Sequence, residues 1–145
     1  MRILDRFPAT VYAIRMKPDT SDSPVQVLVV DDQERLRAVL RDLVDGLDGM
    51  AVAGEASSGE GALAAAERLQ PQFVVMDVRM PGMDGIETTR RLVDQHPDTV
   101  VLLVSVDGAG ESERIRTCGA AGFLPKQQLS RSALADFWRE HRPEG

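Results

Sequence analysis

The stretch "VLVVDDQERLR", residues 27–37, joins four apolar residues to two adjacent aspartates and then to a helical pattern. A run of Val and Leu is typical of a buried strand, but two neighbouring carboxylates at its end repel each other and lose solvation. A cation beside Asp31 and Asp32 would compensate both costs. The pair therefore predicts a bound cation, and the simpler alternative is a cap cluster at the start of the following helix.

Composition limits the class of protein. The 145 residues, 43% hydrophobic and 28% charged, suit one domain with a single core. The net charge of -6 argues against a general nucleic-acid surface. One cysteine, Cys118, cannot form an internal disulfide, and the chain has neither a long apolar span nor a signal-peptide pattern. We expect a cytoplasmic protein without direct contacts to nucleic acid or membrane.

The chain divides into three parts. Residues 1–24 end in "MKPDTSDSP", whose Pro, Ser, Asp and Thr content is typical of a solvated linker, so we expect a flexible extension there. Within it, "TVYAIRM" fits a short strand or a turn of helix equally well. Residues 25–141 form the expected domain, and residues 142–145 a tail.

Apolar runs alternate with amphipathic stretches from residue 25 onward. Three of the runs are nearly unbroken Val, Leu and Met, as expected for strands covered on both faces. Five strands that are each followed by a helix imply right-handed crossovers and a doubly wound parallel sheet of the α/β class. The predicted strands are residues 25–30, 50–56, 73–77, 99–105 and 121–125.

Five helices are expected between and after these strands. Ser57 or Ser58 would cap the second, and Pro71 would end it. The predicted helical stretches are residues 36–47, 59–70, 84–96, 110–119 and the segment after Ser130. The larger side chains predicted to face the core are Leu36, Val39, Leu40, Leu43, Val44, Leu47, Leu63, Ala66, Leu69, Ile86, Thr89, Leu92, Val93, Ile115, Cys118, Leu134, Phe137 and Trp138.

Chemically active residues collect at the predicted strand ends. In an open parallel sheet, ligands bind outside the carboxyl ends of the strands. Three carboxylates, one hydroxyl and one ammonium meet there, which suits a hard divalent ion such as Mg²⁺ and phosphate oxygens. They belong to Asp31, Asp32, Asp77, Ser105 and Lys126.

This set predicts phosphoryl chemistry. Carboxylates such as that of Asp77 form acyl phosphates, with a metal neutralising the phosphoryl charge. Lys126 would place a positive charge near the phosphoryl oxygens, and the Ser105 hydroxyl would donate to one of them.

Four sequence blocks carry a resemblance to a known family. "VLVVDD" (27–32), "FVVMDVRMPGMDGIE" (73–87), "VVLLVS" (100–105) and "GAAGFLPK" (119–126) resemble the receiver domain of bacterial two-component response regulators. The resemblance covers about residues 25–141, and the last block is most similar to receivers of the NarL/FixJ type. It implies a flavodoxin-like sheet with strand order 2-1-3-4-5, and five helices.

The resemblance also implies roles for single residues. Asp77 would be the phosphoacceptor, and Asp31 and Asp32 the acidic pair that binds Mg²⁺ or Mn²⁺ together with Asp77 and the backbone carbonyl of Arg79. Lys126 would contact the phosphoryl group.

By the same resemblance, two further residues would transmit the effect of phosphorylation to the surface of the domain. Ser105 would be the switch hydroxyl that moves toward the phosphoryl group, and Phe123 the aromatic residue that turns inward when Ser105 moves. A sensor histidine kinase or a histidine phosphotransfer protein would be the donor. The face formed by the fourth helix, fifth strand and fifth helix would change its partner affinity, and a homodimer through this face is implied.

The sequence also departs from the pattern. Pro125 precedes Lys126 and Gln127 follows it, so no cis peptide is expected after the lysine. Only 19 residues follow Lys126, so we expect no output domain in this chain, which leaves a stand-alone receiver or a fragment of a longer DNA-binding regulator.

Two other functions are alternatives to a phosphorylation-dependent switch in partner binding. One is an interaction module that ignores phosphate, and the intact site residues count against it. The other is a phosphatase of small substrates, which would need an acid two residues after the nucleophile, where this chain has Arg79. We therefore expect no enzyme beyond autocatalysis of phosphorylation and dephosphorylation.

Two hypotheses concern the lifetime of the phosphorylated form and its contact surface. Arg79 and Asp107 each lie two residues beyond a site residue and would flank the route of an attacking water. Paired across the site mouth, they would make the phosphorylated form long-lived. An exposed Trp138 would mark a contact surface.

Overall fold

The computed structural model describes residues 23–106 and 112–143, so Asp107 and nearly all of the predicted extension lie outside the described residues. A single parallel sheet forms the centre of the molecule, with strand order β4-β3-β5-β6-β7, which is 2-1-3-4-5 in chain order. The predicted fold class is confirmed. The strands are β3 (Val25–Val30), β4 (Met50–Ala56), β5 (Phe73–Asp77), β6 (Val100–Ser105) and β7 (Gly122–Pro125).

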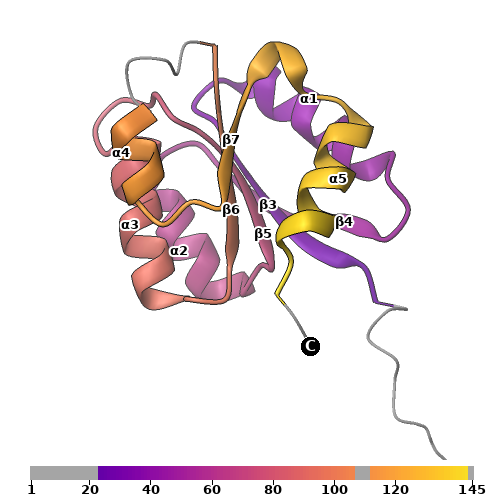
Figure 1. Cartoon of the computed structure of the whole chain (residues 1–145), viewed down its shortest axis with the longest axis horizontal. Helices are drawn as coiled ribbons and strands as arrows, with labels where there is room; N and C mark the ends of the chain where they lie inside the picture. The colour runs from indigo at the N-terminus through magenta and orange to yellow at the C-terminus, as the bar shows by residue number, and fades with distance from the viewer. Residues whose placement is uncertain (1–22, 107–111, 144–145) are drawn as a thin grey trace, which may run out of the picture.

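Helices cover both faces of the sheet. Figure 1 shows α1 and α5 on one face and α2, α3 and α4 on the other, as in a doubly wound fold. No helix among the described residues is long and apolar enough to cross a lipid bilayer. The helices are α1 (Glu34–Asp45), α2 (Gly59–Leu69), α3 (Gly85–Gln95), α4 (Ser112–Thr117) and α5 (Arg131–His141), and a 3₁₀ turn, η3 (Lys126–Gln128), follows β7.

The central strands divide the core into two layers. In β3, Leu28 and Val30 pack with residues of α2, α3 and α4, while Val27 and Val29 pack with residues of α1 and α5. All four side chains are fully buried. This explains the unbroken apolar run, because successive residues of a strand point to opposite faces and both faces are covered here.

Several helix ends follow from their capping residues. Ser58, one of the two predicted caps, accepts a hydrogen bond from the Gly61 N–H at 2.9 Å and starts α2. Ser130 does the same for α5 with the Ala133 N–H, at 3.0 Å. Such side-chain oxygens satisfy N–H groups that have no partner within the helix.

One core prediction is wrong, that for Val39, whereas Leu47 and Trp138 pack against the core as predicted. Val39 was predicted to face inward, but 48% of it is exposed, because it lies about 100° around α1 from the buried Leu40. Helix α1 ends at Asp45, so Leu47 lies beyond it, although it still packs against the core. Trp138 is half-buried, with its ring 5.3 Å from that of Phe73, and is therefore not an exposed contact residue.

Edge strand β4 contains a bulge. Val27 of β3 pairs with Val52, but the next residue, Leu28, pairs with Gly54, so Ala53 is an extra residue in β4. A β-bulge of this kind interrupts the regular alternation of side chains between the two faces.

The bulge changes which side chains of β4 reach which helix. Before it, Val52 packs on the side of α1 and α5. After it, Gly54 lies against Leu69 of α2, and Glu55 reaches the arginines of α1. Strict alternation would have placed Gly54 on the same side as Val52 and Glu55 on the opposite side.

Candidate functional site

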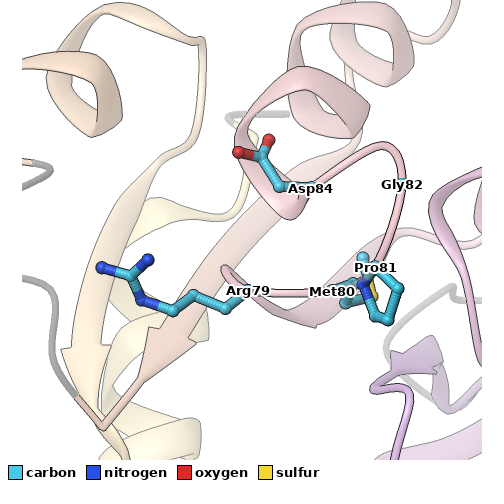
Figure 2. A pocket seen from close by; sticks show the side chains of 5 residues that line it. All are labelled: Arg79, Met80, Pro81, Gly82 and Asp84. Carbon is cyan, nitrogen blue, oxygen red and sulfur yellow. The ribbon is translucent and has the colours of Figure 1, made fainter.

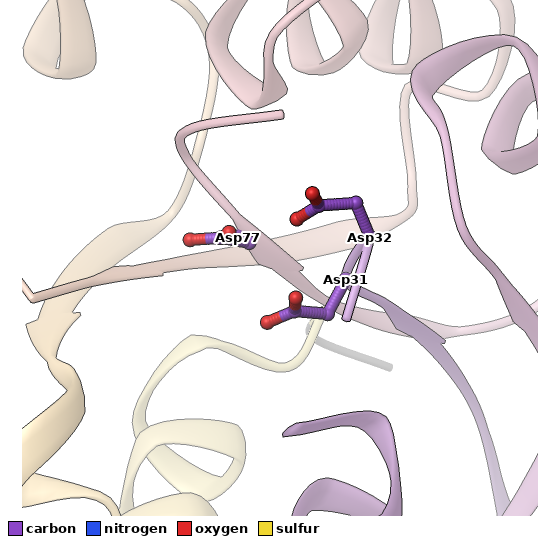
Figure 3. A group of neighbouring side chains, drawn as sticks. All are labelled: Asp31, Asp32 and Asp77. Atoms are coloured by element: carbon purple, nitrogen blue, oxygen red, sulfur yellow. The ribbon is translucent and has the colours of Figure 1, made fainter. Parts of the chain in front are cut away.

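Three carboxylates converge at the carboxyl ends of the two central strands. Asp31 follows β3, Asp77 is the last residue of the neighbouring β5, and Asp32 follows Asp31. Each offers an oxygen within 4.8 Å of the others, and Figure 3 shows all three carboxylates directed to the same side. Asp31 is fully buried and Asp77 is 6% exposed, so their charges need nearby compensation.

Lys126 supplies part of that compensation. Its Nζ lies 3.2 Å from Oδ2 of Asp31 and 3.4 Å from Oδ1 of Asp77. Lys126 follows β7 at the edge of the sheet, and its flexible four-carbon stem carries the ammonium to the central strands. The predicted convergence of Asp31, Asp77 and Lys126 is therefore present in the structure. The peptide bond after Lys126 is trans, as predicted.

Burial dominates the electrostatics of Asp77. Loss of solvation raises the pKa of its carboxyl above the ordinary value, and the Lys126 ammonium opposes this by lowering the pKa. The negative charge of Asp31 raises the pKa further, whereas the backbone N–H of Arg79 donates a hydrogen bond that lowers it. Loss of solvation is the largest of these effects, so the net result is a raised pKa for Asp77.

Asp31 is held rigidly. Its Oδ1 accepts a hydrogen bond from the Gln33 N–H at 2.9 Å, and its own N–H donates to the carbonyl of Ala56 at 3.1 Å. Arg37 of α1 donates from Nη1 to the Asp31 carbonyl oxygen at 2.7 Å. Among the described residues, the Asp32 carboxylate forms no hydrogen bond or ion pair, so its oxygens remain available to a ligand.

Arg37 was not among the predicted site residues. One of its further partners, Glu55, is 18 positions away on the edge strand, and no local pattern links the two. The only available signal was an arginine one helical turn and a half beyond the acidic pair, which is common on exposed helix faces.

Ser105 and Phe123 occupy the part of the site nearer the sheet edge. Ser105 ends β6 next to β5, is 1% exposed, and pairs in register with Pro125 of β7. Phe123 is half-buried and packs against the core layer under α2, α3 and α4. The structure thus places Ser105 beside Asp77 at the carboxyl ends of neighbouring strands β6 and β5. Phe123 lies on β7, the strand next to β6.

The loop after β5 wraps closely around Asp77. Figure 2 shows it running from Arg79 past Gly82 to Asp84, with the exposed Arg79 side chain directed away from Pro81. These residues and Met80 line a shallow hollow. Gly82 has φ +77°, a left-handed conformation that favours glycine.

Gly85 permits the closest approach in this loop. A Cβ at this position would lie 2.2 Å from the carbonyl oxygen of Asp77. The Gly85 N–H instead donates to the Val78 carbonyl at 2.8 Å, so the start of α3 is fixed against the end of β5. Asp84 caps α3 by accepting from the Glu87 N–H at 2.9 Å.

The donor set fits a hard divalent cation. Mg²⁺ prefers oxygen ligands and commonly takes one or two carboxylates while keeping several waters. The three carboxylates, one of them with both oxygens available, meet that preference.

Comparison with known proteins identifies the family. The family model described as the response regulator receiver domain matches residues 27–136. The chain belongs to the response regulator receiver domain family. Receiver domains act in two-component signalling, and they bind Mg²⁺ at an acidic pocket such as the one formed here by the three aspartates.

Individual relatives agree with this assignment. The chain is 43% identical over 103 residues to the response regulator GacA of Pseudomonas protegens, covering 70% of this chain and 48% of that protein. It therefore spans about half the length of the curated relatives it matches first. The receiver domain of the putative response regulator NarL from Mycobacterium tuberculosis is 31% identical, with a TM-score of 0.73 over 82% of this chain and 99% of that one.

A second solved structure shows a similar likeness. The response regulator domain of Thermotoga maritima CheB is 32% identical, with a TM-score of 0.71 over 81% of this chain and 95% of that chain.

Proposed function

We propose that this receiver domain accepts a phosphoryl group on Asp77 from a sensor histidine kinase or a histidine phosphotransfer protein. One observation carries the proposal. The Asp77 carboxylate lies at the end of a central strand, with Asp31 and Asp32 within 4.8 Å and the Lys126 ammonium 3.4 Å away. Burial raises the pKa of the Asp77 carboxyl, so its carboxylate is more basic than one in water, which suits a nucleophile.

The transfer step uses the carboxylate directly. An Asp77 oxygen forms a bond to phosphorus while the bond from phosphorus to the donor's imidazole nitrogen breaks, and the electron pair stays on that nitrogen. Lys126 then exchanges its contact with Asp77 for one with a phosphoryl oxygen. The Ser105 hydroxyl donates to another phosphoryl oxygen.

The metal-binding part of the proposal involves four residues. Asp31, Asp32, Asp77 and the backbone carbonyl of Arg79 would hold Mg²⁺ or Mn²⁺. When bound, the ion neutralises charge on the phosphoryl oxygens. The available oxygens of Asp32 and the close grouping of the three carboxylates support this arrangement.

The signal would pass from Ser105 to the face formed by α4, β7 and α5. Movement of Ser105 toward the phosphoryl group leaves space that Phe123 fills, and partner affinity of this face changes. Helix α4 has only six residues and is anchored mainly by Ile115 and the adjacent Cys118, which suits an element that moves. A homodimer through this face belongs to the same proposal.

Two alternatives remain to be tested. In the first, the domain is a phosphate-independent interaction module. In the second, it is the receiver part of a longer DNA-binding transcriptional regulator, which is supported by the match to only 48% of the length of GacA. We further propose that the chain catalyses only its own phosphorylation and dephosphorylation. The cytoplasm is the compartment we propose, and the reduced, buried Cys118 suits it.

Intact mass measurement tests the proposed function. The protein is incubated with Mg²⁺ and a small-molecule phosphodonor, beside Asp77→Asn and a sample with chelator. We expect a single phosphoryl adduct that requires both Asp77 and the metal. Absence of an adduct, together with failure to bind beryllofluoride, would favour the phosphate-independent module. Hydrolysis of a generic phosphate ester would instead indicate a phosphatase.

A further inference from the structure

Arg37 connects the acidic pair to the edge of the sheet. Its guanidinium donates from Nη1 to the Asp31 carbonyl oxygen at 2.7 Å and from Nε to Oε1 of Glu55 at 3.2 Å, and Nη2 contacts Glu34. The side chain is 14% exposed, an unusual degree of burial for an arginine on a surface helix. Its planar fork allows these contacts to be made at once.

The contact with Asp31 fixes a particular peptide group. The Asp31 carbonyl belongs to the peptide bond that joins Asp31 to Asp32, and Arg37 is the side chain among the described residues that hydrogen-bonds to it. The peptide is planar, so holding its carbonyl also fixes the direction of the backbone at Asp32.

Asp32 depends on this backbone restraint more than its neighbour does. The Asp31 carboxylate is held by the Gln33 N–H and by Lys126, whereas the Asp32 carboxylate has no such contact among the described residues. The position of the Asp32 oxygens therefore depends on the main chain and on two side-chain torsions, so a fixed main chain removes part of their freedom. A metal ligand must be placed within about 0.5 Å to bind well, so this restraint bears on affinity.

We propose that Arg37 is a positioning residue for the metal site, which holds the Asp31–Asp32 peptide so that the Asp32 carboxylate is preset toward Asp77. Glu55 anchors the guanidinium from β4. This inference rests on the proposed function, because it requires that the three aspartates bind Mg²⁺.

An effect of Arg37 through its charge and an effect through its placement of the ligands predict opposite changes in Mg²⁺ affinity when Arg37 is removed. A positive charge near the site repels a cation, so if Arg37 acted only through its charge, removing it would tighten Mg²⁺ binding. If Arg37 positions the ligands, removing it weakens binding, because residues that orient metal ligands typically contribute 10–100-fold to affinity. The sign of the change separates the two roles.

Arg41 provides a matched control. It lies one turn further along α1 and contacts the same Glu55 at 2.9 Å and Glu34 at 3.8 Å, but among the described residues it forms no hydrogen bond or ion pair with Asp31. Arg41→Met therefore removes one positive charge and two ion pairs from the same helix face while leaving the acidic pair held. Arg37→Lys keeps the charge but removes the fork.

Calorimetric titration of the full chain with Mg²⁺ tests the inference. We expect Arg37→Met to weaken Mg²⁺ binding about tenfold, Arg37→Lys to weaken it nearly as much, and Arg41→Met to change it less than about twofold. Unchanged or tighter binding in Arg37→Met would overturn the positioning role. Equal weakening by Arg41→Met would show that the effect is general to the helix and overturn it as well.

Two further measurements keep the result decisive. Thermal unfolding with chelator shows whether each variant is folded, and Glu55→Gln, which loosens the anchor but retains Arg37, replaces Arg37→Met if that variant does not fold. We expect Glu55→Gln to weaken Mg²⁺ binding severalfold, and no change would overturn the inference. If wild type itself binds no Mg²⁺, the proposed function fails, which is a different outcome from failure of Arg37 alone.

Discussion

The ammonium of Lys126 donates to the carboxylate of Asp31 at 3.2 Å, across 95 positions of sequence. The same Nζ contacts Asp77 at 3.4 Å, so one cation is shared by two buried carboxylates. A single positive charge does not compensate two negative ones, and the site is thus prepared for a second cation.

Lys126→Met should separate metal binding from phosphorylation. Without the ammonium, Mg²⁺ meets less repulsion, and we expect its affinity to rise roughly threefold. Phosphorylation should slow about 100-fold, because a donor aimed at the developing phosphoryl charge is lost. Calorimetry and the rate of adduct formation measure the two effects. A variant that is phosphorylated at the wild-type rate would remove Lys126 from the proposed chemistry.

Asp77→Asn should stabilise the metal-free protein at neutral pH. Burial raises the pKa of Asp77 above 3.8, so the folded state keeps its proton to higher pH than the unfolded chain. The free energy of unfolding therefore falls as pH rises through the interval between the two pKa values. A gain of about 1 kcal/mol in Asp77→Asn would raise Tm by roughly 4 °C.

Thermal unfolding in chelator, at pH 7.5 and near pH 4, measures this difference. We expect the advantage of Asp77→Asn to shrink at the lower pH, because a larger share of wild-type Asp77 is then protonated. The exposed Asp98 provides the control, and Asp98→Asn should leave Tm nearly unchanged at both values. A lower Tm for Asp77→Asn at pH 7.5 would contradict the prediction.

Gly85→Ala should damage both stability and the site. The new Cβ would lie 2.2 Å from the Asp77 carbonyl oxygen, so the start of α3 or the end of β5 must shift. We expect a loss of about 1–3 kcal/mol in the free energy of unfolding. Gly61→Ala is the comparison, since its Cβ would lie 3.1 Å from the Ser58 hydroxyl, and urea denaturation of both variants measures the difference. Equal stability would show that the contact is relieved without cost.

Arg79→Ala should shorten the lifetime of the phosphorylated form. Arg79 is exposed at the rim of the site, and we predict that it pairs with Asp107, which lies outside the described residues. Loss of the pair would open the route of an attacking water, so the adduct should decay severalfold faster after donor removal. Asp107→Ala should have the same effect, and the double variant should decay no faster. An unchanged decay rate would argue against the pairing.

Trp138→Ala should act on stability rather than on partner binding. The indole packs 5.3 Å from the ring of Phe73 and is half-buried. Losing this packing should cost about 2 kcal/mol, somewhat less than for a fully buried aromatic residue. Urea denaturation measures the cost, and adduct formation should be unaffected. Wild-type stability combined with altered oligomerisation would restore Trp138 as a contact residue.

The strands could be predicted from sequence because burial on both faces leaves an unbroken apolar run. The predicted bounds of β3, β4 and β5 agree with the structure residue for residue. The meeting of Asp31, Asp77 and Lys126 was also predictable, since parallel strands deliver their carboxyl ends to one edge.

Features set by neighbouring elements could not be predicted in this way. An apolar stripe does not tell where the covered side of a helix ends, and Val39 lies beyond that limit. Arg37 and Glu55 meet because α1 lies beside the end of β4, a relation that no local spacing records. The role of Arg37 therefore became visible only with the tertiary structure.

The bulge at Ala53 makes the pairing register of an edge strand part of the chemistry. If β4 kept Ala53 but paired regularly with β3, strict alternation would turn Glu55 toward α2, away from Arg37. A one-residue slip far from Asp77 in the chain would thus remove the support of the acidic pair while leaving every site residue in the sequence. Removal of Ala53, in contrast, would keep Leu28 opposite Gly54 and Glu55 facing α1, so β4 tolerates only those changes in length that preserve the faces of the residues after the bulge.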